Sequence, residues 1–354
     1  MPGGATCWGN NVFGQLGDGS RALRRAPVSV SGLDSGVVAV STGANHSCAL
    51  TIGGGVKCWG ANFQNQLGNG TTSQSLVPID VSGLTAGVQA IDIGISHTCA
   101  LTTGGGVKCW GLNSSGQLGD GSSTNRAVPT DVSGLTSGVV AISAGDRHTC
   151  ALTMAGGVKC WGNNQYGQLG DGTTTASLVP VDVPSLTSGV AAISAGAGQG
   201  HTCALTLGGS VKCWGYNGYG NLGDGSYTNR STPVDVSGLT GIAAISAGYY
   251  LTCAVTTDGA MKCWGNNNYG KLGNGGLAIS NQPTPADVPG FGGAVAAISA
   301  GREHTCAVTT SGVAKCWGWA QFGQLGIDDR NYGLPDHVLG LGPAIFQSGF
   351  ELGQ

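Results

Sequence analysis

Hydrophobic and polar residues follow one another in the same order about every fifty positions along the chain. A representative unit holds four short apolar runs, at 139–145, 148–153, 158–162 and 178–183, separated by glycine-rich turns. Runs of four to seven residues bounded by glycine are typical of β-strands, and no segment keeps a helical period. Pro180 places the fourth run at a sheet edge. Each unit therefore predicts a four-stranded antiparallel sheet.

The repeat itself predicts the architecture. Periods of this length are typical of propellers and other arrays, and short four-stranded units closing on themselves form a β-propeller. Each unit is marked by one Cys-Trp-Gly triplet, and these begin at Cys7, Cys58, Cys109, Cys160, Cys213, Cys263 and Cys316. We expect seven blades around a central channel. Small residues of the first run suit that centre, and each triplet tryptophan should fill the space between blades.

The blade boundaries follow from the same period. We expect a single all-β domain over residues 1–354, with six blades near 36–86, 87–137, 138–188, 189–240, 241–291 and 292–342. The seventh blade would combine a first strand from 343–354 with third and fourth strands from 1–35. Sharing one blade between the two ends of the chain would close the ring and remove free sheet edges.

In six units, a second cysteine stands ten residues before the triplet cysteine. In one of them the turn 257–259 has glycine last, and such a hairpin sets Cys253 directly opposite Cys263. Opposed residues have Cα atoms about 4.5–5.5 Å apart, which suits a disulfide. The spacing predicts Cys48–Cys58, Cys99–Cys109, Cys150–Cys160, Cys203–Cys213, Cys253–Cys263 and Cys306–Cys316. Buried reduced cysteines are the alternative, whereas the absence of Cys-x-x-Cys disfavours a metal site.

Six disulfides would place the protein in an oxidising compartment, extracellular or periplasmic. Cys7 has no partner at the repeat spacing. We expect its partner strand upstream of Met1, together with any signal peptide, which this chain does not contain. No stretch is long and apolar enough to span a membrane.

Charged residues and histidines add no catalytic or cofactor signal. The net charge is −3, from 15 basic and 18 acidic residues, so no basic patch predicts a nucleic-acid partner. Histidine recurs at one repeat position in five units, with Leu251 in its place in another, and these units form blades about 10 Å apart, whereas zinc needs nitrogens within about 2.1 Å. We expect each histidine to bond a nearby backbone carbonyl. The Asp-Gly and Asn-Gly stretches predict turns rather than calcium sites. We expect no metal, no cofactor and no enzyme activity.

The unit resembles the RCC1 repeat, whose pattern recurs across essentially the whole chain. In the third unit it is matched by Gly145, His148, Ala151, Leu152, Gly157, Val158, Trp161, Gly162, Asn164, Gly167, Gln168, Leu169, Gly170 and Gly172. The resemblance implies a seven-bladed propeller but no single function. Its members include nucleotide-exchange and chromatin factors, a plant ultraviolet photoreceptor and secreted bacterial inhibitors of β-lactamase.

Two departures from the family pattern narrow this resemblance. The paired cysteines are absent from the nuclear type and imply an extracytoplasmic, bacterial one. The photoreceptor type carries tryptophans in the turn before the second strand. Here those turns hold other residues, such as Tyr249 and Tyr250.

The residues that do not repeat are the candidates for function. In an antiparallel blade, the first–second turn and the third–fourth loop emerge on the same face, and variable loops usually carry function. The turns give the candidate binding residues Asp146, Arg147, Gln199, Tyr249, Tyr250, Arg302, Glu303 and Phe350. The third–fourth loops carry the aromatic residues Phe13, Phe63, Tyr166, Tyr216, Tyr219, Tyr269, Trp319 and Phe322, which could instead pack the bases of the loops.

Tyrosine and arginine anchor many protein interfaces. We therefore expect a non-enzymatic binding module that takes a protein partner, of unknown identity, through this face. A glycan or cell-envelope ligand is the alternative. An enzyme-inhibitor role and a nucleotide-exchange or chromatin role rank below both.

Overall fold

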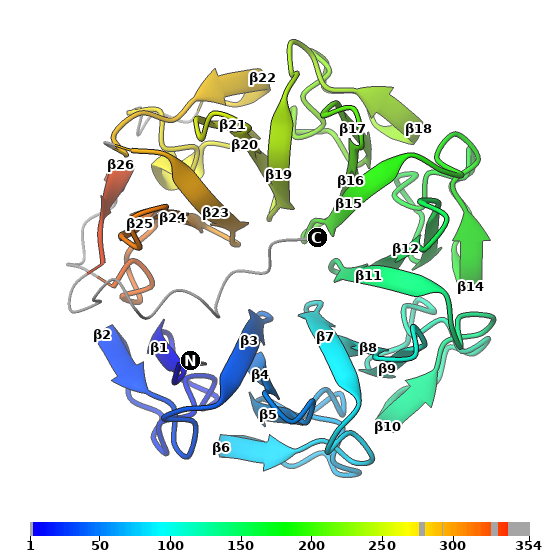
Figure 1. Ribbon diagram of the computed structural model, residues 1–354, viewed down its shortest axis with the longest axis vertical. Coiled ribbons are helices and arrows are strands. Elements are labelled where there is room, and N and C mark those ends of the chain that lie inside the picture. The colour runs from blue at the N-terminus through cyan, green and yellow to red at the C-terminus, as the bar shows by residue number, and fades with distance from the viewer. Residues whose placement is uncertain (1–2, 276–279, 292, 327–331, 339–354) are drawn as a thin grey trace.

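The computed structural model describes residues 3–275, 280–291, 293–326 and 332–338, and within them the fold is a ring of β-sheets. The described residues form six four-stranded sheets and one two-stranded sheet. Figure 1 shows these sheets arranged around a common centre. This confirms the prediction of an all-β propeller with four-stranded antiparallel blades. The expected first strand of the seventh blade, within 343–354, lies outside the described residues. Its pairing in that blade therefore stays a prediction, as do the exact domain boundaries.

Each blade consists of four consecutive strands, and the bounds of equivalent strands repeat closely. The first strands are β3 (Val37–Thr42), β7 (Val88–Ile93), β11 (Val139–Ala144), β15 (Val190–Ala195), β19 (Ile242–Ala247) and β23 (Val295–Ala300). The second strands are β4 (His46–Thr51), β8 (His97–Thr102), β12 (His148–Thr153), β16 (His201–Thr206), β20 (Leu251–Thr256) and β24 (His304–Thr309). These are blades one to six in chain order.

The outer strands complete the blades. The third strands are β5 (Val56–Gly60), β9 (Val107–Gly111), β13 (Val158–Gly162), β17 (Val211–Gly215), β21 (Met261–Gly265) and β25 (Ala314–Gly318). The fourth strands are β6 (Ser75–Asp80), β10 (Arg126–Asp131), β14 (Ser177–Asp182), β18 (Arg230–Asp235), β22 (Gln282–Asp287) and β26 (Tyr332–His337). The seventh sheet pairs β1 (Thr6–Gly9) with β2 (Arg24–Ser29), and one 3-10 helix, η1 (Asn268–Gly270), lies in a loop.

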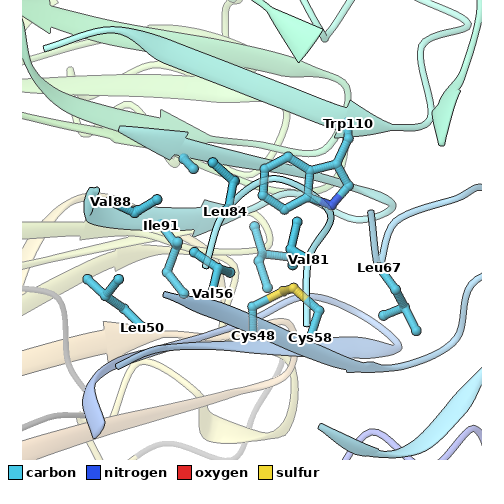
Figure 2. Packing of buried hydrophobic residues seen from close by; sticks show 12 residues of the cluster. Cys48, Leu50, Val56, Cys58, Leu67, Val81, Leu84, Val88, Ile91 and Trp110 are labelled. Atoms are coloured by element: carbon cyan, nitrogen blue, oxygen red, sulfur yellow. A yellow bond between two sulfur atoms is a disulfide. The ribbon is translucent and has the colours of Figure 1, made fainter. Parts of the chain in front are cut away.

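The six predicted disulfides are all formed. In every blade the two cysteines face each other across the second and third strands, as Cys253 faces Cys263. The paired Cα atoms are 4.0–4.1 Å apart, slightly closer than expected. Cys7 has no disulfide partner among the described residues. Figure 2 shows Cys48–Cys58 packed among apolar side chains, with Trp110 of the next blade over them.

The triplet tryptophans lie between blades, as predicted. Trp110 is fully buried, and its indole Nε1 donates a hydrogen bond of 2.9 Å to the backbone oxygen of Gln66 in the preceding blade. Gly68 must be glycine, because its φ is +68° and a Cβ there would lie 2.6 Å from that Nε1. Trp8 of the seventh sheet donates the equivalent bond, 3.1 Å, to the Gln324 oxygen of blade six. The same contact therefore joins the seventh sheet to the ring.

The repeated histidines correct one expectation, because they do not bond a nearby backbone carbonyl. Each of four histidine Nε2 atoms instead lies 2.9–3.0 Å from a threonine hydroxyl of the next blade, in the pairs His46–Thr98, His97–Thr149, His148–Thr202 and His201–Thr252. The Thr149 hydroxyl donates to the Gln117 oxygen, so its own oxygen accepts from His97. The histidine therefore links two blades, which a one-dimensional repeat does not reveal.

Polar side chains also fix the outer loops. Asp120 accepts hydrogen bonds from Ser122 and Asn113 and pairs with Arg126 at 2.6 Å, so the Asp-Gly stretch is a cross-braced turn. No three potential metal ligands gather anywhere in the described ranges. Five of the six strand lysines pair with an aspartate of the neighbouring strand, as Lys57 does with Asp80 at 2.6 Å, whereas Lys315 donates to the Gly290 oxygen. None of the described helices is long and apolar enough to cross a bilayer.

Candidate functional site

The first–second turns and third–fourth loops lie on one face of the ring, which we call the loop face. Tyr250, from the turn between β19 and β20, contacts two tyrosines of the loop between β17 and β18. Its ring centroid lies 5.3 Å from that of Tyr216 and 4.8 Å from that of Tyr219. Loop residues of blade four and turn residues of blade five thus form one surface.

Five tyrosines form a continuous group on this face, which we call the tyrosine cluster: Tyr166, Tyr216, Tyr219, Tyr249 and Tyr250. Neighbouring ring centroids lie 4.3–6.1 Å apart. Each such aromatic contact contributes about 0.5–1.5 kcal/mol beyond its buried area. Burial raises the pKa of the Tyr216 and Tyr250 hydroxyls, so both stay protonated and able to donate at neutral pH. The cluster is therefore a rigid aromatic surface with hydrogen-bond donors.

A two-residue insertion in blade four makes room for the cluster. Gly198, in the turn between β15 and β16, packs under the Tyr250 ring, and a Cβ there would lie 2.7 Å from Tyr250 Cε1. Tyr250 itself has a φ of 64°, a left-handed conformation that is uncommon for residues other than glycine. Gln199, next to Gly198, is exposed. The turns of blades four and five thus depart together from the repeat.

Lys271 is the second departure, because most other units carry glutamine at its position. Gln168 shows the usual role, since its Oε1 accepts the Tyr166 backbone N–H two residues earlier at 2.9 Å. Lysine has no acceptor for that bond. Lys271 instead extends toward the turns, where its Nζ donates to the backbone oxygens of Tyr249 and Arg302, at 3.0 and 3.1 Å.

The third partner of Lys271 is a carboxylate. Its Nζ also donates to Glu303 Oε2 at 3.0 Å, and the lysine side chain is only 1% exposed. Burial lowers the pKa of Lys271, while the negative charge of Glu303 opposes that shift. The buried ammonium is therefore bonded to three oxygens from two neighbouring turns, which fixes those turns relative to each other.

The lysine also changes the loop that carries it. Tyr269 lies two residues before Lys271, so its backbone N–H lacks the glutamine acceptor found in other units. Tyr269 has a φ of 62° and is 42% exposed. Its ring stacks on Trp319 of blade six, with centroids 5.4 Å apart and planes 23° apart, and Trp319 contacts Phe322 edge-on. A second aromatic surface therefore adjoins the tyrosine cluster.

Charged residues stand in the turns of blades three and six, beside the central channel. Arg302 of blade six is exposed, and its guanidinium lies 5.0 Å from the Tyr249 ring centroid. Asp146 of blade three is half-buried beside the exposed Arg147. Burial raises the pKa of Asp146 to about 6, and the charges of Arg147 and Arg302 partly oppose this. Two arginines, from blades three and six, therefore favour the charged form of this carboxyl group.

The central channel has a volume of about 570 Å³ and is lined mainly by small residues of the first strands. Its one aspartate, Asp92, stands where most other units have serine. Asp92 Oδ2 accepts the Ala144 N–H of the next blade at 2.8 Å, as Ser143 Oγ accepts that of Ala195. Burial raises the pKa of Asp92 to about 6, against several hydrogen bonds that lower it. Asp92 therefore has a structural role, because it joins two neighbouring blades.

The structure gathers only part of the residue set expected from sequence. Tyr249, Tyr250, Arg302 and Glu303 lie together in the turns of blades five and six. Asp146 and Arg147 lie in the first–second turn of blade three, Gln199 is exposed in the blade-four insertion, and Phe350 lies outside the described residues. Sequence reasoning missed Lys271, Gly198 and Asp92. The available signal was that Lys271 and Asp92 replace the residue that their repeat position usually carries.

Comparison with known proteins identifies the family. The model of the RCC1-like domain matches residues 4–345. The ultraviolet-B receptor UVR8 of Arabidopsis thaliana is 34% identical over 300 residues, which are 83% of this chain and 68% of that protein. The human probable E3 ubiquitin-protein ligase HERC4 is 36% identical over 225 residues, 62% of this chain but only 21% of that protein.

Solved structures show the same fold at lower identity. Yeast RCC1 (Prp20), in a crystal structure with Kap60, superposes with a TM-score of 0.83 at 21% identity, covering 95% of this chain and 84% of that one. Human WBSCR16 gives a TM-score of 0.82 at 24% identity, with 96% and 94% covered. The propeller, its repeat and these matches agree with the resemblance seen in the sequence, and the chain belongs to the RCC1-like domain family.

Proposed function

We propose that this protein is a non-enzymatic binding module that takes a protein partner through the loop face of blades four to six. One observation carries the proposal: departures from an otherwise regular repeat concentrate in this sector. Leu251 replaces the repeated histidine, Lys271 replaces glutamine, and Gly198 lies in an inserted turn. Local rules that are broken without a gain in packing are typical of functional sites.

The composition of the sector supports a protein as the ligand. Tyrosine and arginine dominate the energetic centres of protein interfaces, and rigid aromatic rings lose little conformational entropy on binding. The tyrosine cluster and Arg302 supply both residue types on one surface. Among the family's solved structures, yeast RCC1 is bound to another protein, Kap60.

The proposed compartment is an oxidising one, extracellular or periplasmic. Six disulfides support it, because such bonds persist outside the reducing cytosol. An ultraviolet-B receptor role like that of UVR8 is not proposed, because no turn before a second strand contains tryptophan.

The test is affinity capture from secreted and cell-envelope fractions with the oxidised protein. We expect a partner to be retained by wild type and lost when Tyr249, Tyr250 and Arg302 are all replaced by alanine. The matched control replaces Phe13 and Phe63 by alanine; they form an edge-on aromatic pair of the seventh sheet and blade one, outside blades four to six, with ring centroids 5.7 Å apart. Retention by the triple variant would remove the support for this surface.

A glycan or cell-envelope ligand is the second candidate, favoured by the exposed Tyr269 ring stacked beside Trp319. Flat, accessible aromatic rings suit the apolar faces of sugars. In that case, glycosidase treatment of the captured fraction should abolish retention. A Tyr269→Ala variant should then lose more binding than the Tyr249/Tyr250/Arg302 triple variant.

A further inference from the structure

We infer that the channel-mouth side of the loop face is built for an acidic partner segment, and that Lys271 sets this preference by holding Glu303. The inference rests on the proposed binding role of the loop face and names the chemistry of the partner. Lys271 acts here as a specificity-determining residue that positions and neutralises its neighbours. The partner's carboxylates would meet Arg302 and Arg147.

The charge distribution of the turns gives the first step. The first–second turns of blades one to six contain four charged residues: Asp146, Arg147, Arg302 and Glu303. The two arginines are exposed, whereas the two acids are half-buried. A partner approaching along the channel axis therefore meets the cationic groups first.

The buried lysine gives the second step. Glu303 follows Arg302 directly in the sequence. Without a partner, its negative charge would offset the positive charge of Arg302 and repel a carboxylate of the partner. Lys271 instead bonds Glu303 at 3.0 Å from a position that is 1% exposed. The ion pair has no net charge, so the ammonium weakens the repulsion that Glu303 alone would exert on a partner's carboxylate. Lys271 thus leaves Arg302 as the effective charge of blade six.

The orientation of Arg302 gives the third step. Its guanidinium lies over the Tyr249 ring, and Lys271 binds the backbone oxygens of both residues. A guanidinium stacked on an aromatic ring keeps its N–H edge free for a carboxylate, which it can bind with two parallel hydrogen bonds. The neighbouring tyrosine hydroxyls are further donors. The surface therefore offers donors and cationic charge beside apolar rings.

Two single substitutions separate this role from a purely structural one. Lys271→Gln restores the usual repeat residue and releases Glu303, so affinity for an acidic peptide should fall about three- to tenfold. Glu303→Gln removes the acid but leaves both backbone bonds of Lys271, so affinity should stay equal or rise up to about threefold. If the Lys271–Glu303 pair had a purely structural role, both variants would lose binding. Lys57→Gln is the charge-matched control, because Lys57 lies in β5 and pairs with Asp80.

The experiment selects ligands without assuming their charge. A phage-displayed library of random dodecapeptides is panned on the oxidised full chain, after depletion on the folded Tyr249/Tyr250/Arg302 alanine variant. The best peptide is synthesised together with an amide version (Asp/Glu to Asn/Gln) and a lysine version. Dissociation constants are measured by fluorescence anisotropy at low and high salt. We expect enrichment of acidic residues and at least about tenfold weaker binding of the amide version, with Arg302→Glu preferring the lysine version.

Each other result overturns the inference in a recognisable way. Neutral or basic peptides that still require Tyr249 and Tyr250 would refute the acidic partner and leave the proposed binding face intact. No enrichment over the alanine variant would refute both. Parallel losses in Lys271→Gln and Glu303→Gln would assign Lys271 a structural role and overturn its part in specificity. Thermal melts of every variant establish that it is folded before binding is compared.

Discussion

Replacing His148 with leucine should change how the stability of the propeller depends on pH. His148 is fully buried, and its Nε2 bonds the Thr202 hydroxyl of the next blade while its Nδ1 has no partner. Protonation at Nδ1 would therefore create a buried charge and an unpaired donor. Burial lowers the pKa of His148 to about 4 for this reason. The chain itself supplies the replacement, because Leu251 occupies the equivalent position of blade five.

The sign and size follow from proton linkage. Between the lowered pKa of about 4 and the ordinary value of 6.5, the unfolded chain binds a proton that the folded chain excludes. Stability from His148 is therefore complete above pH 6.5 and is lost as the pH falls, by about 2 kcal/mol at pH 5. His46, His97 and His201 are buried in the same way, with pKa values of about 3.

Two carboxyl groups oppose the histidines. The pKa values of Asp92 and Asp146 are raised to about 6, so the folded chain binds more protons there, and their contribution grows as the pH falls. Near pH 5, the four histidines and two acids together make the unfolded chain bind about two more protons than the folded chain. The free energy of unfolding therefore falls by roughly 3 kcal/mol for each pH unit of acidification. The half-buried His304 adds at most about one more proton to this difference. In the comparison of wild type with His148→Leu, every group except His148 cancels.

The assay is guanidinium chloride unfolding of the oxidised protein at pH 7.5, 6 and 5, followed by the fluorescence of the buried tryptophans. Between pH 7.5 and 5, the variant should gain about 2 kcal/mol relative to wild type. Leu251→His is the reverse variant and should steepen the wild-type dependence, since Thr305 holds the repeat position that binds the histidine in other blades and its hydroxyl likewise donates to a backbone oxygen. Parallel pH profiles for wild type and His148→Leu would refute the assignment of a neutral, proton-excluding histidine.

Two further predictions concern the disulfides and the inserted turn. Replacing both Cys150 and Cys160 by alanine opens a ten-residue loop and should lower the free energy of unfolding by about 3 kcal/mol. Non-reducing mass spectrometry should still find the other five disulfides. An unchanged free energy of unfolding would contradict this prediction. Gly198→Ala places a Cβ against Tyr250 and should weaken partner capture. Gly32→Ala is the control, because Gly32 also has a positive φ but no atom lies within 4 Å of its added Cβ. It should cause similar backbone strain, about 1–2 kcal/mol, and leave partner capture unchanged. Equal binding by both variants would argue against a preorganised Tyr250.

The sequence alone was enough for everything that is local in the chain. The second and third strands of blade three appear at 148–153 and 158–162, as the apolar runs predicted. The ten-residue cysteine spacing predicted each disulfide, because a short hairpin turn fixes which residues face each other. The fifty-residue period predicted the propeller, because each unit folds into one blade, and the residues conforming to the RCC1 repeat pattern indicated the family.

Apart from the tryptophans between blades, which the sequence predicted, the polar contacts between blades were decided only by the tertiary structure. Lys271 reaches Glu303, 32 residues further along the chain, and His148 reaches Thr202 across a gap between sheets. A repeat in sequence states that equivalent residues occupy equivalent places, but not which side chain crosses to the neighbouring blade. The turns that carry Asp146 and Arg302 are far apart in the sequence, and only the ring places blades three and six around one channel. The packing of neighbouring blades therefore built the candidate site from turns that the sequence could only list separately.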